Sequence, residues 1–534
     1  MKSITKYLTR INILFLVFFL GSSIYFLINR SIEQNFFIYS NSDLLYLPSF
    51  FRDYWEGAYN WKLWVLTPAP YFFPDAFVFF LASIVNHNLY LSFFLYALFF
   101  SVLLIFSTSL LLGLFLDKIS LLNIVHGVTL CLPFWLILIS YYPEDIALFL
   151  FPSYHSSVIL ISLLLYFLFV KMKNHLNSFY FILISSLTLM SDKQLIYTFF
   201  FPFFFAMLTM RDYRSQRNHY KVLLYFLFSL VISSIFLKIL SYFSIFQIPG
   251  IPILTETKKI LFQFKIVENV KLAMPEILQF FKEFYSNKLP IFILFLIGTA
   301  LNIYYAFSFF IKNNVLNLYS RYVLFLYLFS VLSQAFYGIW GGFRYVWGFY
   351  FFPFISILFY MGDIYSRILS NRIFTKVNFF KSSLFFHSKN NLKFQAIFST
   401  LILFLILLNI FFLKVKTNNT VNNPYPPFIA CLDNLQGKYK LQNGISDYWN
   451  AKHIRYLSQT HLIVNQVFSN LEKYNWIHNR DWYNHDRNGN ELIYNFIIPE
   501  RLELNLIINK FGTPTLIEKC GARDVYIYKN GFKL

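Results

Sequence analysis

Charged residues are scarce in this chain, and the common signatures of soluble enzymes are absent from it. Only 13% of its 534 residues are Asp, Glu, Lys or Arg, whereas 57% are hydrophobic and 22% are aromatic. The sequence has no glycine-rich phosphate loop, HExxH, GxSxG or CxxC, which excludes the nucleotide, zinc-protease, hydrolase and dithiol sites that these motifs mark. An ordinary soluble globular protein of this composition is also excluded.

Long apolar stretches occupy most of the first 413 residues. About 20 apolar residues are enough to span a bilayer. Eleven stretches are of this length or close to it, and they are centred on residues 11–29, 89–116, 119–142, 153–170, 177–190, 194–210, 222–243, 290–311, 322–340, 346–362 and 394–413. The sequence therefore predicts an α-helical polytopic membrane protein with about eleven transmembrane helices. An uncleaved first helix fits this topology better than a signal peptide.

Acidic residues are nearly absent from one set of loops, and this asymmetry sets the predicted orientation. With the N-terminus inside, the inner loops are short and basic, and their only acids are Asp117, Asp212 and Asp363, which leaves 22 of the 25 acids outside. The positive-inside rule then predicts N-in and C-out. Much of the net charge of +20 is explained by these loops rather than by nucleic-acid binding. We expect a multi-pass protein of a bacterial inner membrane.

Three outer segments are long enough to fold. Residues 30–88 are acidic and aromatic and predict short helices at the headgroup level. Residues 244–289 predict a loop with an amphipathic helix at 271–285. The tail starts with a linker, residues 414–426, which precedes a periplasmic α/β domain at 427–534. In this domain we expect strands at LIVNQVF, LIYNFII and DVYIYK, and a helix in ERLELNLIINKFG that Gly512 closes.

Cysteine is rare, and its placement predicts a disulfide. Cys131 lies in a predicted membrane helix, whereas Cys431 and Cys520 both lie in the tail. Two cysteines in a domain exposed to an oxidising compartment commonly pair, although two separate buried thiols are the alternative. Such a bridge would close a loop of about 90 residues and contribute roughly 4 kcal/mol by the chain-entropy estimate.

The first outer segment carries candidate acids. Asp43 stands in SDLLY, and Asp53 and Glu56 follow in FRDYWEG. A carboxylate at the outer membrane surface can act as a general base or bind a divalent metal ion. A solvated loop acid or a helix cap is the structural alternative for each. Asp43 is favoured because Ser42 and Asp43 could begin a short helix that fixes the side chain.

Further polar groups interrupt the apolar runs on the outer side. Glu144 and Asp145 are adjacent where a predicted helix emerges, and His155 begins the next one. Each has a structural alternative, as a helix cap for the acids and as a hydrogen-bonded interface residue for His155. Asp192 and Lys193 follow a half-helix of about 14 residues, or roughly 21 Å, so we expect them below the outer surface, lining a cavity or forming a salt bridge.

One cation lies in a very short outer turn. Arg344 in GGFRYVWG is flanked by aromatics, and the two glycines before it allow close backbone approach. A guanidinium at headgroup height suits a phosphate group, and a snorkelling Arg is the alternative. Lys238, near the outer end of its helix, is expected to snorkel.

The arrangement resembles the GT-C superfamily of integral-membrane glycosyltransferases. The resemblance rests on an in-to-out first helix, about eleven helices, and a first outer loop reading SDLLYLPSFFRDYW and then TPAPYFFPD, in which Asp43 matches the superfamily acid. It covers residues 1 to about 413. A single Asp stands where many members have paired acids.

The resemblance implies an inverting sugar transfer from a polyprenyl-phosphate-linked donor to a glycan, lipid or protein acceptor. Asp43 would be the base. Arg344 and Lys193, beside Asp192, would offset charge on the lipid phosphate, and Glu144 or Asp145 would orient the acceptor or hold a metal ion.

Two other classes share this topology. A polymerase or ligase of lipid-linked glycans usually relies on outer Arg and His residues, which are sparse here. A lipid or glycan transporter should have charged or broken helices in both halves of a repeat, and no such symmetry is visible.

Overall fold

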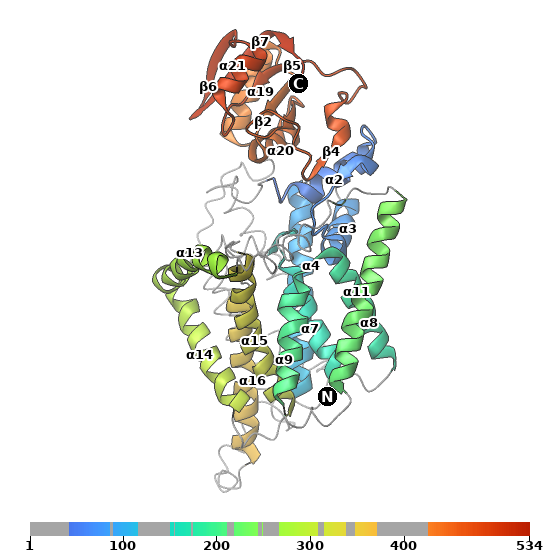
Figure 1. The fold of residues 1–534 in the computed structure, drawn as a ribbon, viewed down its shortest axis with the longest axis vertical. Helices are drawn as coiled ribbons and strands as arrows, with labels where there is room; N and C mark the ends of the chain where they lie inside the picture. The colour runs from blue at the N-terminus through green and yellow to red at the C-terminus, as the bar shows by residue number, and fades with distance from the viewer. Residues whose placement is uncertain are drawn as a thin grey trace, which may run out of the picture.

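The computed structural model describes residues 42–85, 89–115, 150–153, 155–171, 175–210, 218–243, 248, 266–307, 314–337, 348–370 and 425–534. These residues are mostly helical, with a small mixed sheet in the tail. Figure 1 shows the tail at one end of the helical region, with the first outer segment between them.

The helical region supports the prediction of a membrane protein. Eight of the eleven predicted spans overlap helices, namely α4 (Leu89–Phe115), α7 (Ser157–Val170), α8 (His175–Ser191), η3 and α9 (Ile196–Phe200 and Phe201–Thr209), α11 (Asn218–Tyr242), α14 (Leu289–Phe307), α15 (Asn314–Tyr337) and α16 (Gly348–Ser370). Stretches 11–29, 119–142 and 394–413 lie outside the residues described. Within the described parts, α4, α11, α14 and α15 are long and apolar enough to cross a membrane. The count of eleven and the orientation stay predictions.

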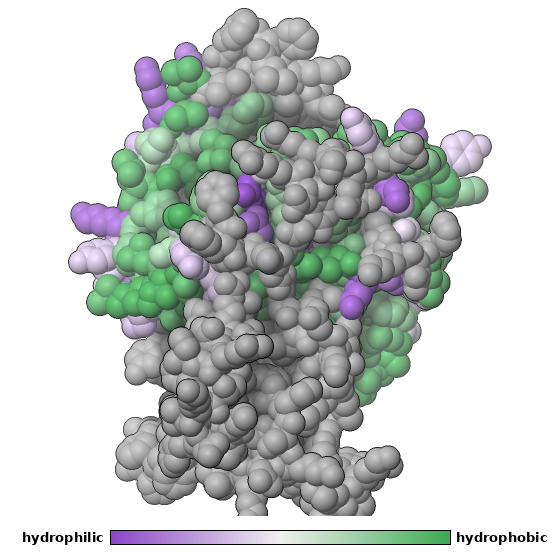
Figure 2. Space-filling model, turned by 90° about the horizontal axis from the view of Figure 1, so that it is seen from below, coloured by the Kyte–Doolittle hydropathy of each residue, from purple (hydrophilic) through white to green (hydrophobic). Residues whose placement is uncertain are grey.

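The surface of these helices is apolar in the way that lipid contact requires. Leu224, Phe228 and Val231 on α11 are each about half exposed. Figure 2 shows large hydrophobic areas with scattered hydrophilic residues over the part of this face that is coloured. Exposed apolar area of this extent is unfavourable in water and favourable against lipid tails.

The helices approach each other closely where residues are small. A Cβ added to Gly298 of α14 would lie 2.6 Å from the Cα of Pro353 in α16, so glycine is required at that contact. Beside it, the Asn302 amide and the Ser356 hydroxyl hydrogen-bond between the same two helices at 3.0 Å. Buried polar contacts of this kind hold membrane helices together in the absence of a strong hydrophobic force between them.

The outer segments fold into short elements. The first segment forms α2 (Tyr46–Glu56), η1 (Trp61–Leu63), β1 (Trp64–Val65), η2 (Phe72–Ala76) and α3 (Phe77–Val85). The predicted amphipathic helix is α13 (Ile266–Asn287), which is longer than expected at both ends. Ala273 and Ile277 of α13 pack on Ala335 of α15, while Leu272 and Leu278 remain exposed. This distribution suits a helix lying at the membrane surface.

The tail is a three-layer α/β fold. Its elements are α19 (Pro427–Tyr439), β2 (Asn443–Ser446), α20 (Tyr448–Leu457), β3 (Ile463–Gln466), β4 (His478–Asn479), η6 (Arg480–Tyr483), β5 (Tyr494–Ile497), α21 (Leu504–Phe511), β6 (Leu516–Cys520) and β7 (Arg523–Phe532). The sheet order is β3-β2-β5-β7-β6, in which β2 is parallel to β3 and β5 while β7 is antiparallel to β5 and β6. One hydrophobic cluster, with α19 and α20, covers one face, and a second, with α21, covers the other.

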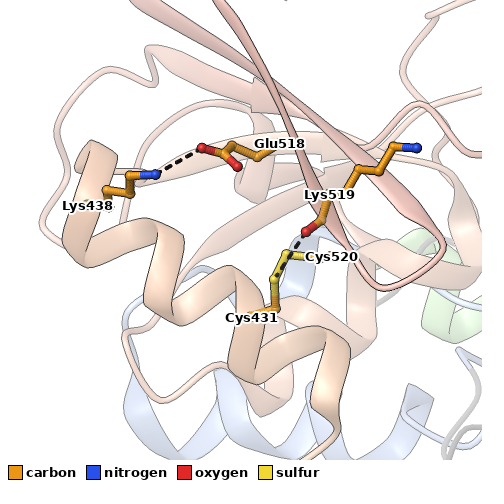
Figure 3. Close-up of a disulfide and its surroundings, with 5 residues drawn as sticks. All are labelled: Cys431, Lys438, Glu518, Lys519 and Cys520. Carbon is orange, nitrogen blue, oxygen red and sulfur yellow. Dashed lines mark hydrogen bonds and ion pairs between the residues drawn. A yellow bond between two sulfur atoms is a disulfide. The ribbon is translucent and has the colours of Figure 1, made fainter.

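The two cysteines of the tail form a disulfide, which is the pairing expected from their placement. Cys431 of α19 and Cys520 at the end of β6 have Cα atoms 5.6 Å apart and lie 89 residues apart in sequence. An ion pair between Lys438 and Glu518, at 3.1 Å, links the same helix and strand (Figure 3). The covalent link therefore attaches the outermost strand of the sheet to the helix that covers it.

Protein prepared from an oxidising compartment is expected to carry this bridge. Peptide mapping by mass spectrometry without reduction should find the Cys431 and Cys520 peptides linked, and reduction should separate them. Recovery of both peptides as free thiols would contradict the pairing and, with it, the outside location of the tail.

The tail is not an independent module, because it pairs with the first outer segment. Strand β1 is antiparallel to β4, with Trp64 opposite Asn479 and Val65 opposite His478. Tyr448, Ile477 and Trp482 of the tail belong to the hydrophobic core of the helical region. The junction between the two parts is therefore a packed interface.

Candidate functional site

Asp43 lies at this junction, in a turn that leads into α2. Helix α2 begins at Tyr46, whose backbone N–H donates to the Asp43 carbonyl at 3.2 Å. Asp43 therefore precedes the helix by three residues. The adjacent Ser42 hydroxyl donates to the Tyr448 carbonyl at 2.5 Å. These two backbone attachments fix the position of the carboxylate.

The Asp43 side chain faces the tail and is half-buried. The hydroxyl of Tyr448, at the start of α20, donates to Asp43 Oδ1 at 2.5 Å. The charge of Asp43 also acts on Lys452, one turn further along α20, and on Tyr474. A short hydrogen bond to a carboxylate is strong and directional, so the geometry holds Asp43 in one orientation.

Asp53, by contrast, is fully engaged in holding the junction together. It is 2% exposed, and its Oδ2 accepts from the indole N–H groups of Trp64 and Trp482 and from the Asn479 amide, each at 2.9 Å. Burial raises the pKa of Asp53, while the nearby Arg455 opposes the rise. This geometry favours a structural role over acceptor or metal binding. Glu56 is exposed and lies 3.6 Å from Arg487.

His155 and Asp192 lie together in a second cluster at the ends of α7 and α8. Asp192 Oδ2 is 2.6 Å from His155 Nδ1, and the His155 Nε2 is 2.9 Å from the Tyr71 hydroxyl. Because an ionised carboxylate can only accept, His155 Nδ1 donates to Asp192, and Nε2 faces the Tyr71 hydroxyl. Asp192 Oδ1 accepts from the Gln194 N–H at 2.9 Å, which fixes the carboxylate. The structure thus brings two predicted residues into one hydrogen-bonded array.

A further acid, which sequence reasoning did not single out, lies beside this array. Asp75 of the PYFFPD stretch is 2% exposed and accepts from the hydroxyls of Tyr96 and Ser157. Its charge interacts with those of Asp192 and His155. The signal in the sequence was an acid within an otherwise apolar aromatic stretch, where ionisable groups are costly and usually functional.

The backbone is strained at the same cluster. Tyr71, Ser153 and His155 have φ values of 55°, 71° and 63°, in the left-handed region that residues other than glycine rarely adopt. Conformations of this kind cost about 1–3 kcal/mol each and concentrate at functional sites. Tyr71 and His155 are in direct contact, and five more non-glycine residues with positive φ lie in the tail.

A short chain of contacts connects the two clusters. The hydroxyl of Tyr46, on the first turn of α2, donates to the Pro70 carbonyl at 3.1 Å. The next residue, Tyr71, then reaches His155. Asp43 and the Asp192 array are therefore linked through the first outer segment. Lys193, adjacent to Asp192, is half-buried.

Arg344, Glu144 and Asp145 lie outside the described residues, so their predicted roles are not tested. Among the residues that are described, no three His, Cys, Asp or Glu side chains converge as a metal site would require. The carboxylates of Asp43 and Asp53 in particular point to different partners. No step is therefore assigned to a metal ion.

The tail also contributes buried cations that look like ordinary surface residues in the sequence. Lys452 and Arg455 of α20 are 1% and 3% exposed, and the Lys452 ammonium has no hydrogen-bond partner in the described structure. Burial lowers the pKa of Lys452 to about 7 and that of Arg455 to about 10. The Arg455 guanidinium lies 4.0 Å from the centre of the Trp482 ring. Sequence reasoning missed both, because a charged residue in a polar helix predicts a solvated face.

Comparisons with known proteins identify no relative. The chain matches no known family model, and it has no detectable similarity to a curated protein or to a solved structure.

Proposed function

We propose that this protein is a membrane glycosyltransferase that moves a sugar from a polyprenyl-phosphate donor to an acceptor at the outer face of the membrane. The observation that carries the proposal is the position of Asp43, a half-buried carboxylate that Tyr448 orients at the junction of the helices and the tail. The apolar surface of the helices supports access from lipid. The loop sequence around Asp43 resembles the first outer loop of GT-C transferases.

In this mechanism, Asp43 removes the proton from an acceptor hydroxyl, and the oxygen of that hydroxyl attacks the anomeric carbon of the donor sugar. The bond from that carbon to the donor phosphate breaks, and the electron pair leaves with the polyprenyl phosphate, so the configuration inverts. A positioned general base of this type contributes about 10²–10⁴-fold. Lys193 supplies positive charge toward the departing phosphate, and Arg344 adds to it.

The array of Tyr71, His155 and Asp192 shapes the floor of the proposed site. It holds the chain at Pro70 and Tyr71 against the start of α7 and the end of α8. Asp75 adds a second buried carboxylate, whose charge interacts with those of Asp192 and His155.

The proposed sidedness requires the tail to lie outside. Periplasmic-type reporters fused after Leu413 are expected to be active, and cytoplasmic-type reporters at the same position inactive, because the basic loops hold the other face inside. A fusion at residue 372 is the matched control and should give the opposite pattern. Activity of the cytoplasmic reporter after Leu413 would contradict the orientation and the outer location of Asp43.

The activity itself is testable with purified protein in proteoliposomes. Addition of a polyprenyl-phosphate sugar and a mixed acceptor fraction is expected to release polyprenyl phosphate, and heat-inactivated protein should release none. A polymerase or ligase would instead consume oligosaccharides linked through polyprenyl diphosphate. Turnover of that donor alone would replace the proposed function with the ligase class.

A further inference from the structure

We infer that Tyr448 and Lys452 of the tail are positioning residues for Asp43, so that the tail completes the catalytic site. The inference rests on the proposed function and extends it to a domain whose role nothing else assigns. It is carried by the contact of Tyr448 with Asp43 and by a buried ammonium that has no hydrogen-bond partner in the described residues.

The start of α20 is fixed so that both side chains reach the first outer segment. Asp447 caps the helix by accepting from the Trp449 N–H at 2.8 Å. Tyr448 and Lys452 are four residues apart, so they lie on the same helix face. Ala451 belongs to the hydrophobic cluster under the sheet, on another side of α20. The helix therefore presents one face to its own domain and another to Asp43.

Lys452 is held in place by packing rather than by hydrogen bonds. Its ammonium lies 4.6 Å from the centre of the Tyr448 ring, whose hydroxyl binds Asp43. A buried ammonium without a hydrogen bond is destabilising unless a nearby opposite charge compensates it. The negative charge of Asp43 supplies such compensation, because it raises the pKa of Lys452 against the effect of burial. Such a costly buried group, coupled to the charge of one carboxylate, is better explained by function than by folding.

The surroundings of Lys452 single it out as the group that changes charge near neutral pH. The titratable groups that face Lys452 or its partner are Asp43 before α2, Tyr448 and His453 on α20, Tyr474 after β3, and His478 on β4. Burial lowers the pKa of His453 to about 4, and lowers that of His478 well below its ordinary value. Both imidazoles are therefore neutral at pH 7, whereas the pKa of Lys452 is about 7.

The protonated and neutral forms of Lys452 should differ in their effect on Asp43. Below pH 7 the ammonium attracts the carboxylate and keeps it beside Tyr448. As the pH rises through about 7 the ammonium loses its proton, and this attraction is lost. Transfer should therefore decline on the alkaline side of about pH 7.

The test compares Lys452→Met, Lys452→Arg and Tyr448→Phe with the control Lys438→Met, a surface lysine paired with Glu518. We expect Lys452→Met and Tyr448→Phe to lower kcat by roughly 10- to 100-fold, since each removes an interaction with a charged group, while KM changes little. Lys452→Arg should keep activity above pH 7, where the wild type declines. Wild-type kcat and pH profile in Lys452→Met would overturn the inference.

A second readout does not depend on transfer activity. Because the folded state binds fewer protons at Lys452 than the unfolded state above about pH 7, thermal stability of the full-length protein should rise from pH 7 to 9. Lys452→Met should abolish most of this rise and melt at least as high as the wild type at pH 7. A Lys452→Met protein that melts lower would show a structural role for Lys452 and overturn the inference. If Lys452→Met melts as expected but Asp43→Asn remains fully active, Lys452 is a buried group beside Asp43 as inferred. The proposed role of Asp43 as the catalytic base is then wrong.

Discussion

Replacement of Asp43 by Asn is expected to lower sugar transfer by about 100-fold or more. The amide keeps the size of the side chain and an oxygen that can accept from Tyr448, but it cannot take a proton from an acceptor hydroxyl. A positioned general base contributes about 10²–10⁴-fold, and this contribution is lost. Initial rates with the variant in proteoliposomes, at protein levels matched by quantitative blotting, measure the effect.

The matched control is Glu56→Gln on the same outer segment. Glu56 is exposed and lies 3.6 Å from Arg487, a surface pair of the type that contributes at most about 1 kcal/mol. We expect nearly unchanged transfer from this variant. If Asp43→Asn also transfers sugar at close to the wild-type rate, Asp43 is a structural residue and the base must be sought elsewhere.

Folding should not explain a loss of activity in Asp43→Asn. The side chain is half-buried, and the amide oxygen of the variant can retain the hydrogen bond from Tyr448. Lys452 can lose its proton when the Asp43 charge is removed, so the variant is not left with an uncompensated buried ammonium. Unchanged expression, membrane insertion and melting temperature are therefore expected.

Local sequence patterns were sufficient for the elements that are stabilised locally. Strands β3 and β5 lie within the predicted segments, and β7 extends beyond the predicted DVYIYK at both ends. Runs of β-branched and aromatic residues favour strands at these positions. Helix α21 ends at Gly512, whose φ of 81° suits glycine. The apolar runs likewise predicted the long helices, since a lipid environment leaves few other structures possible.

Helix α20 was not predicted, and the reason is its environment. Its sequence, YWNAKHIRYL, carries three basic residues, which predicts a solvated segment rather than a core helix. In the structure Lys452, His453 and Arg455 are buried between the tail and the first outer segment. The partners on the first outer segment, Asp43 and Asp53, are about 400 residues away in sequence, so no local pattern records the contact.

In the candidate site too, local sequence patterns indicated single residues but not the contacts between distant ones. Asp192 and His155 were each proposed from local context, but their 2.6 Å contact joins positions 37 residues apart. Asp43 and Asp53 looked equivalent in sequence, ten residues apart in one acidic segment. Only the fold shows that Asp53 is buried and surrounded by three donors, two of them from the tail, while Asp43 is half-buried and accepts from the Tyr448 hydroxyl. Tertiary contacts therefore distinguish Asp53, which holds the junction together, from Asp43, the proposed base.

Replacement of Asp53 by Ala is expected to loosen the tail from the first outer segment. The change leaves the two indole N–H groups of Trp64 and Trp482 and the Asn479 amide without their acceptor, and Arg455 without its nearby negative charge. Removing one partner of a buried charge network costs about 3–5 kcal/mol. Opening of the junction should therefore become roughly 10²- to 10⁴-fold more frequent.

Hydrogen exchange of the full-length protein measures this opening. In Asp53→Ala, amides of β1 (Trp64–Val65) and β4 (His478–Asn479) should exchange faster, because these strands pair only across the junction. Amides of β2 should stay protected, since that strand lies inside the tail's own sheet. Asp53→Asn keeps an acceptor oxygen and should have a smaller effect, which separates the lost hydrogen bonds from the lost charge. Wild-type exchange at β1 and β4 in Asp53→Ala would show that Asp53 does not hold the junction together, and the apolar contacts of Tyr448, Ile477 and Trp482 would then have to hold the tail in place.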